Sequence, residues 1–165
     1  MSWTIQIYRA KPNPAGKDRA KTSGATPEQL LAEWVDLKNI GDQSVTLSWL
    51  NLSNFHYDNN CKREDSPTIY WTGESTDVLG VGKIVRVHTG RASQSASMLA
   101  ADRAGADLHV FANRGNFILN NKCGDVLGVW YKSTQDKSWL KDDGTYYDPN
   151  PGEGAVLVRT NAKLA

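Results

Sequence analysis

The sequence predicts an all-β fold in which short antiparallel strands form a sandwich or barrel. Three observations lead to this prediction. About eight to ten short runs show the apolar alternation or the β-branched enrichment that is typical of strands. Glycine, proline and asparagine turns separate these runs. Helical periodicity is confined to at most two brief segments, and strands without intervening helices favour antiparallel pairing.

The N-terminal part predicts a strand, a long loop and one helical turn. Residues Trp3–Tyr8 alternate apolar and polar side chains, as a half-buried strand does. Residues Arg9–Pro27 contain three prolines and two glycines and predict a loop. A short helix is expected after it, with Thr26 as the N-cap, Pro27 at the first position and Gln29 completing a capping box.

The stretch "EWVDLKNIGDQSVTLSWLNLSN", residues 33–54, predicts a hairpin. Its first run alternates, with tryptophan and aspartate on one face and valine and leucine on the other. Residues 39–42 predict the turn, in which we expect Gly41 to have a positive φ.

The apolar positions of the second run change phase between Leu47 and Leu50. Such a shift indicates a bulge, or a strand that changes its partner. Trp49 then points away from the core face, where it fills the bulge or makes an exposed contact.

The rest of the chain continues the same pattern. The clearest strand lies in "GVGKIVRVHTG", and "ASQSASMLAADRAGAD" predicts a short helix or a loop. We expect further strands in Thr68–Trp71, three between residues 108 and 133, and one in Ala155–Thr160. Residues 136–154 predict a turn-rich segment.

Composition restricts the class of protein. A chain of 165 residues suits one domain, which we expect to span residues 1–165. A net charge of +1 argues against a general polyanion binder. The N-terminus has no apolar secretory leader and no run is long enough to cross a bilayer, so we expect a cytoplasmic protein, or an exported one if a leader precedes this sequence. For a cytoplasmic protein Cys61 and Cys123 are expected as free thiols, and the alternative is one disulfide in an oxidising compartment.

A basic segment and one tryptophan are the candidate binding residues. The segment from residue 9 to 21 has a local net charge of +4 and could dock phosphate or an acidic partner, although a solvated loop is the simpler interpretation. The candidates for contact with a partner or polyanion are Arg9, Lys11, Lys17, Arg19, Lys21 and Trp49.

No pattern predicts catalysis, a cofactor or a metal. "GVGK" at residues 80–83 is followed by a strand rather than a helix, so it indicates a turn and not a phosphate loop. The acidic residues Asp142, Asp143, Asp148 and Glu153 lack calcium-loop spacing and predict solvated turns. None of His56, His88 and His109 lies near a cysteine at a zinc-like spacing, and two of them are expected to point outward from strands. No nucleophile elbow is present.

The order of three motifs resembles the lamin tail domain family, in particular its bacterial members. These motifs are "EWVDLKNIGDQSVTLSWLNLS", "GVGKIVRVHTG" and "FILNNKCGDVLGVWYKS", and "RAKPNPAGKDR" resembles the bacterial lead-in. The resemblance covers roughly residues 5–160. The matching positions are Glu33, Asn39, Gly41, Asn120, Asn121, Gly124 and Asp125. One departure is that Trp49 and Leu50 stand where the family often has glycine and then tryptophan.

The resemblance implies an immunoglobulin-like antiparallel β-sandwich with long loops. Animal relatives engage proteins and DNA, and no catalytic residue or cofactor comes with the family. We therefore expect a non-enzymatic binding or structural module that contacts a protein through loops or a sheet edge. The alternative is nucleic-acid or polyanion binding through the basic segment 9–21. A metal protein or enzyme that uses His88, Cys123 or the Asp142 cluster is the third hypothesis.

Overall fold

The computed structural model describes residues 4–15, 24–74 and 76–165, and these residues form mainly β-structure. Strands make up 40% and helical turns 12%, which confirms the all-β prediction. The strands are β1 (Ile5–Lys11), β2 (Trp34–Asn39), β3 (Val45–Thr46), β4 (Leu50–Asn54), β5 (Thr68–Thr72), β6 (Val78–Leu79), β7 (Ile84–His88), β8 (Leu108–Phe111), β9 (Asp125–Lys132), β10 (Trp139–Tyr147), β11 (Leu157–Thr160) and β12 (Lys163–Leu164). The helical segments are α1 (Pro27–Ala32), η2 (Leu47–Trp49), η3 (Ala92–Ser97) and α2 (Ala100–Arg103).

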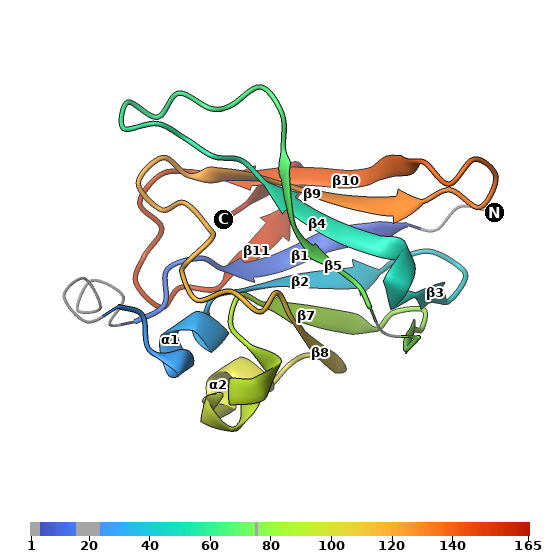
Figure 1. The fold of residues 1–165 in the computed structure, drawn as a ribbon, viewed down its shortest axis with the longest axis horizontal. Coiled ribbons are helices and arrows are strands. Elements are labelled where there is room, and N and C mark those ends of the chain that lie inside the picture. The colour runs from blue at the N-terminus through green and yellow to red at the C-terminus, as the bar shows by residue number, and fades with distance from the viewer. Residues whose placement is uncertain (1–3, 16–23, 75) are drawn as a thin grey trace.

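Ten of the strands form one sheet that folds back on itself and nearly closes. Its order is β5-β4-β9-β10-β12-β11-β1-β2-β7-β8, and β3 and β6 pair separately. Figure 1 shows the half that contains β4, β9 and β10 lying over the half that contains β1, β2 and β7. The short strands β11 and β12 connect the two halves. Two neighbouring pairs, β7–β8 and β10–β12, are parallel, which the prediction of an antiparallel fold missed.

The core lies between the two halves. Alternate residues of each strand point inward, so that one continuous cluster forms from both halves. Buried members of the cluster include Ile5, Ile7, Val35, Leu37, Val85 and Val87 on one half and Leu50, Leu52, Leu127 and Val129 on the other.

The first strand is longer than the sequence predicts. β1 continues through Lys11, so Arg9 and Lys11 belong to a strand and not to the predicted loop. Arg9 lies opposite Asp36 on one side and Val158 on the other. The strands β2 and β11 offer backbone partners on the two sides of β1, so the strand continues through Lys11, the residue before Pro12.

The predicted helix after the loop is confirmed. The Thr26 hydroxyl accepts a hydrogen bond from the Gln29 N–H at 3.2 Å, and the Gln29 side chain accepts one from the Thr26 N–H at 3.0 Å. This reciprocal pair is the capping box expected from the sequence. The Ala/Ser-rich segment forms the short helices η3 and α2.

The turn after β2 exists, but it does not make a hairpin. β2 pairs with β1 and β7, whereas β4 pairs with β5 and β9. The Asn39 side chain holds the turn by accepting from the Gly41 N–H and donating to the carbonyl oxygens of Gln43 and Leu79. Gly41 is absent from the residues with positive φ, so that expectation was wrong.

The phase shift between Leu47 and Leu50 has a clear cause. The 3-10 turn η2 separates β3, which pairs with β6, from β4, which pairs with β9. The chain therefore changes its partner strand there, which is one of the two predicted explanations. Trp49 is half-buried at the end of this turn.

Two further expectations fail in the second half of the chain. Residues 117–119 form no strand, although one was predicted there. The predicted turn-rich segment instead contains β10, which pairs with β9 along its whole length. Within β10, Asp143 accepts the Ile7 N–H at 2.8 Å and pairs with Arg159 at 2.8 Å. These long-range partners keep turn-forming residues in an extended conformation.

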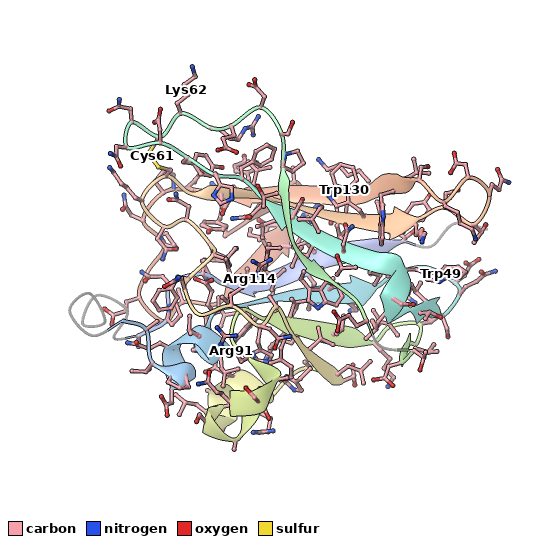
Figure 2. All side chains as sticks on the ribbon, in the orientation of Figure 1. Trp49, Cys61, Lys62, Arg91, Arg114 and Trp130 are labelled. Atoms are coloured by element: carbon pink, nitrogen blue, oxygen red, sulfur yellow. A yellow bond between two sulfur atoms is a disulfide. The ribbon has the colours of Figure 1, made fainter. Side chains whose placement is uncertain are left out.

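Cys61 and Cys123 form a disulfide, so the expectation of free thiols was wrong. Their Cα atoms are 5.4 Å apart, within the range that a disulfide requires. Figure 2 shows Cys61 and the sulfur–sulfur bond on the long connection between β4 and β5. The bond ties this connection to the turn that precedes β9.

Within the described part of the chain, no helix has the length and apolar character needed to cross a bilayer.

Candidate functional site

A groove lies between the two edges of the nearly closed sheet. β5 and β8 are the terminal strands in the sheet order, and Figure 1 shows β5 passing across the side of the molecule on which β8 lies. A cavity of about 450 Å³ is lined by residues 69–74 from β5 and its end, and by residues 109–114 from β8 and the loop after it. We call this cavity the edge groove.

The backbone of β5 presents hydrogen-bonding groups to the edge groove. Gly73 donates its N–H to the Leu50 carbonyl of β4, so the alternation of an antiparallel pair directs the backbone groups of Thr72 away from β4. The Tyr70 carbonyl also faces away from β4, since it accepts a hydrogen bond from Arg114 at 3.0 Å. An edge strand of this kind can pair with an additional strand.

The walls of the edge groove combine apolar and aromatic side chains with polar ones. Val110 and Phe111 contribute from β8, and Ile69, which is 40% exposed, contributes from β5. Trp71 is buried beneath them. Side-chain contacts beside the outward backbone groups of Thr72 suit an extended peptide.

A buried ion pair joins β2 to β7, the strand next to β8. Arg86 on β7 donates from Nε to Asp36 Oδ1 at 2.7 Å and from Nη2 to Oδ2 at 2.9 Å. Arg9 adds a third bond to Asp36 at 2.9 Å. Asp36 is fully buried and Arg86 is 1% exposed, so this bidentate pair satisfies charges that water cannot reach.

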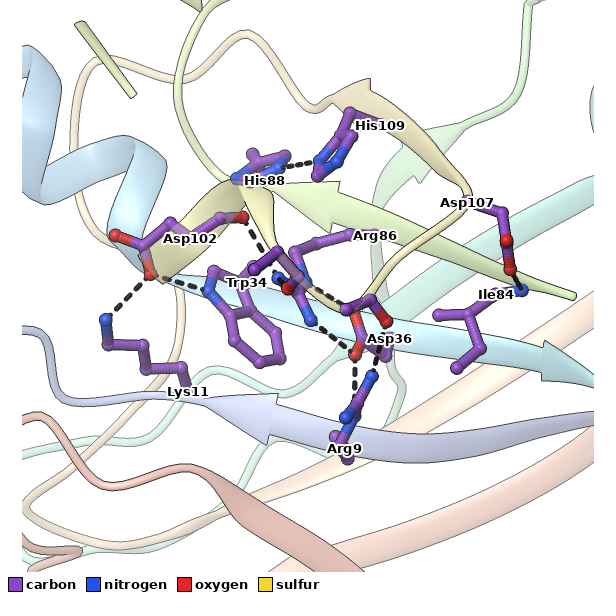
Figure 3. Close-up of polar contacts among 12 residues, drawn as sticks. Arg9, Lys11, Trp34, Asp36, Ile84, Arg86, His88, Asp102, Asp107 and His109 are labelled. Carbon is purple, nitrogen blue, oxygen red and sulfur yellow. Dashed lines mark hydrogen bonds and ion pairs between the residues drawn. The ribbon is translucent and has the colours of Figure 1, made fainter. Parts of the chain in front are cut away.

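The same arginine positions the crossover that leads to β8. Its Nη1 donates to the carbonyl oxygens of Asp102 and Ala104 at 3.0 and 2.7 Å, and its guanidinium lies 3.6 Å from the centre of the Trp34 ring. Asp107 fixes the start of β8 by accepting the Ile84 N–H at 2.9 Å. Figure 3 shows these bonds linking β2, β7 and the crossover. They explain how a parallel strand is held at the sheet edge.

Asp102 anchors the crossover from its other side. Its Oδ1 accepts hydrogen bonds from Lys11 Nζ at 2.7 Å and from the Trp34 indole at 2.9 Å. The carboxylate is fully buried, so Lys11 compensates a charge in the interior.

Two histidines continue this buried network toward the edge groove. His88 Nδ1 lies 2.6 Å from the Leu31 carbonyl, which can only accept, so this nitrogen carries the proton. The Nε2 of neutral His88 then accepts from His109 Nδ1 at 2.8 Å. Because His88 is fully buried, the prediction that it points outward was wrong. His109 lines the edge groove and is half-buried.

Acid is expected to weaken the fold through these histidines. Burial lowers the pKa of His88 from 6.5 to about 4 and also lowers the pKa of His109, and the Arg86 charge acts in the same direction on both. The unfolded chain therefore binds protons at these rings more tightly than the folded chain. As the pH falls from 6.5 to 4, His88 should remove up to about 3 kcal/mol of stability.

The measurement is urea unfolding of the wild type and His88→Gln between pH 4 and 7.5. Burial raises the pKa of Asp125 to about 6, which opposes the histidine effect because the folded state then binds the proton more tightly. The difference between the two proteins cancels this contribution. Parallel pH profiles for wild type and variant would contradict the prediction.

The residues that match the lamin tail pattern have structural roles. Glu33 is fully buried and its Oε1 accepts from the Thr89 hydroxyl at 2.7 Å and from the N–H groups of Ile118 and Leu119 at 2.8 and 3.2 Å. It thereby fixes the irregular segment that replaces the predicted strand. Gly124 has a φ of +73°, and a Cβ at this position would lie 2.4 Å from the Tyr147 carbonyl oxygen.

Asp125 serves the same purpose at the turn before β9. Its two oxygens accept hydrogen bonds from the N–H groups of Phe55, Asn120 and Val126 and from the Asn54 side chain, at 2.9 to 3.2 Å. The motif therefore fixes loops against strands.

Of the predicted binding residues, Arg9, Lys11 and Trp49 belong to the described part of the chain. Arg9 and Lys11 pair with the buried carboxylates of Asp36 and Asp102, so their charges are compensated inside the protein. Lys17, Arg19 and Lys21 lie outside the described residues, and polyanion binding stays a prediction for these three. Trp49 is not among the residues that line the edge groove.

The acidic residues near the C-terminus contact other parts of the fold. Asp142 and Asp143 accept backbone N–H groups of β1, and Asp148 pairs with Lys163. Over the described ranges, no group of three or more histidine, cysteine, aspartate or glutamate side chains could hold a metal ion. Cys123 is in the disulfide, so it is not a thiol ligand.

The residues of the edge groove were missed by the sequence reasoning. "TIYW" and "LHVF" were both predicted as strands, but nothing local shows that they end the sheet. A signal for the covered edge is present in "IVRVH", where valine alternates with arginine and histidine and where His88 was expected to point outward. The crossover covers that face, so both faces of β7 are buried.

The chain was compared with protein-family models and with curated proteins, and neither comparison found a match.

Proposed function

We propose that this domain binds an extended segment of another protein by strand addition in the edge groove. The observation that carries the proposal is that both terminal strands of the sheet, β5 and β8, border one groove. Their outward backbone groups supply hydrogen bonds, and Ile69, Val110 and Phe111 supply contacts for alternate side chains. No catalytic role is proposed for any residue.

The sharpest test removes one outward N–H from β5. Thr72 has an exposed side chain and stands opposite Asn51 with its backbone groups directed away from β4. Thr72→Pro deletes this donor, and proline is tolerated at an edge strand. Thr72→Val keeps the donor and the β-branched shape, so it is the matched control.

The probe is a displayed library of random twelve-residue peptides, followed by anisotropy with the enriched peptides in synthetic form. We expect extended sequences rich in β-branched residues, with binding to Thr72→Pro about tenfold weaker, which equals 1.4 kcal/mol, and binding to Thr72→Val unchanged. Failure to enrich any peptide, or equal binding to both variants, would reject strand addition at this edge.

We also propose that the fold is an immunoglobulin-like sandwich of the lamin tail family. Two facing half-sheets with one core between them support this assignment. The structural roles of Glu33, Asn39, Gly124 and Asp125 support it further, because such roles account for a sequence pattern that carries no catalysis.

The disulfide bears on the compartment in which the protein works. Disulfides persist in oxidising environments and are rare in the cytosol. The Cys61–Cys123 bond therefore supports an oxidising compartment instead of the cytoplasmic location expected from the sequence.

A further inference from the structure

A second cavity lies at the loops and shares no lining residue with the edge groove. Its volume is about 590 Å³, and residues 55–57, 117–122 and 150–151 together with Asn13 line it. We call it the loop pocket. Its size is within the range of pockets that hold small ligands.

The walls of the loop pocket combine aromatic rings with amides. The half-buried rings of Phe55, Tyr57 and Phe117 belong to the lining. So do the side-chain amides of Asn13, Asn120 and Asn150.

The charge of the lining excludes several ligand classes. Lys122 is the one Lys or Arg among the described lining residues, and its ammonium donates to the Asn59 carbonyl at 3.0 Å. No carboxylate belongs to the described lining. A metal ion would therefore lack a negative counter-charge, and an apolar ligand would bury unpaired amides.

Two of the amides keep hydrogen-bonding capacity. Asn13 uses its Nδ2 to donate to the Pro151 carbonyl at 2.8 Å, and Asn120 uses its Oδ1 to accept from the Cys123 N–H at 2.8 Å. Among the described residues this leaves the Asn13 Oδ1 as an acceptor and the Asn120 Nδ2 as a donor. A hydroxyl group both donates and accepts, so it can satisfy either amide.

The pocket is preorganised by bonds behind its walls. The Cys61–Cys123 disulfide joins the connection that carries residues 55–57 to the turn at residues 120–124. Asp125 accepts the N–H groups of both Phe55 and Asn120, and Arg63 lies 4.4 Å from the centre of the Phe55 ring. Walls that are already fixed lose little conformational entropy when a ligand binds.

We propose that the loop pocket binds a neutral saccharide. The hydroxyl groups of a saccharide can donate to the Asn13 Oδ1 and accept from the Asn120 Nδ2. The C–H faces of a sugar ring can pack against the flat aromatic rings. This site is independent of the proposed peptide site at the edge groove.

The test is saturation-transfer NMR with glucose, galactose, mannose, N-acetylglucosamine and their disaccharides, followed by titration of any binder. We expect at least one of these sugars to bind in the millimolar range or tighter. Phe117→Ala should weaken binding about tenfold, whereas Ile69→Ala, which truncates an apolar side chain in the edge groove, should leave it unchanged. Circular dichroism checks that each variant remains folded, and His56→Ala, which changes an exposed lining residue, replaces Phe117→Ala if that variant unfolds.

The results that would overturn the proposal are equally specific. Absence of binding for every sugar at about 10 mM would overturn the proposal. A sugar that binds Phe117→Ala and His56→Ala as tightly as the wild type would also overturn it. Preferential binding of adenosine at the same residues would assign the pocket to another ligand class. Because Thr72→Pro alters the edge groove alone, loss of peptide binding with retained sugar binding separates the two proposals.

Discussion

Replacing Arg86 with methionine is expected to lower the free energy of unfolding by about 3 to 5 kcal/mol. The side chain is 1% exposed and makes two bonds to Asp36, which is fully buried. Methionine keeps much of the apolar volume but removes the positive charge. Among the described residues, Asp36 then retains Arg9 as its one charged partner, and Arg9 is partly exposed.

The Arg86→Met change also removes the two bonds to the carbonyl oxygens of Asp102 and Ala104. A buried carbonyl left without a donor costs about 1 to 3 kcal/mol, which adds to the effect of the unpaired carboxylate. The crossover should therefore loosen together with β8. Hydrogen exchange at residues 102–111 should accelerate more than exchange in β9.

Guanidinium unfolding monitored by tryptophan fluorescence measures the effect. Arg91→Met is the matched control, because Arg91 is exposed and makes a single bond to the Asn113 carbonyl at 3.3 Å among the bonds of the described residues. We expect the control to stay within about 0.5 kcal/mol of the wild type. A loss below about 1 kcal/mol for Arg86→Met would show that the ion pair does not hold the interior.

Removing the disulfide is expected to cost a similar amount. Cys61 and Cys123 are 62 residues apart in sequence, and the chain-entropy relation gives about 4 kcal/mol for a loop of that length. The Cys61→Ala/Cys123→Ala variant should unfold at a correspondingly lower guanidinium concentration. Measured losses for native disulfides are typically about 2 to 5 kcal/mol.

Reductant provides the control for this comparison. Dithiothreitol should lower the midpoint of the wild type toward that of the double variant and should not change the double variant. The Asp125 bonds to Phe55 and Asn120 remain in both forms, so the connection should stay near the turn when folded. Equal stability of oxidised and reduced protein would contradict the prediction.

Local signals predicted those elements whose cause is local. The capping box of Thr26 and Gln29 identified α1, and β-branched residues between glycines identified β7. Short strands with turns between them were enough to predict an all-β fold. These features depend on neighbours within a few residues, so a single sequence contains them.

Features with distant causes were not predicted. β10 contains Asp142, Asp143 and Gly144, which resemble a turn until Ile7 and Arg159 provide partners more than ten residues away. Contacts between residues far apart in the sequence also produce the disulfide, the burial of His88 and the ion pair between Arg9 and Asp36.

The edge groove also depends on contacts between residues far apart in the sequence. Both strands that border the edge groove were recognised, yet their positions at the two ends of the sheet follow from the pairing of all ten strands. The predicted contact residue Trp49 was chosen from a local departure in sequence, and it lies outside both proposed sites.

The connection between the two half-sheets also sets the order in which the fold can be completed. β1 pairs with β2 on one side and with β11 on the other, and β12 lies between β11 and β10 in the sheet. β11 and β12 follow the other ten strands in the chain, so each half can form its own strand pairs before the linking strands are available. Pairing across the link therefore depends on the most C-terminal strands of this sequence, and non-local pairing of this kind is slow to form.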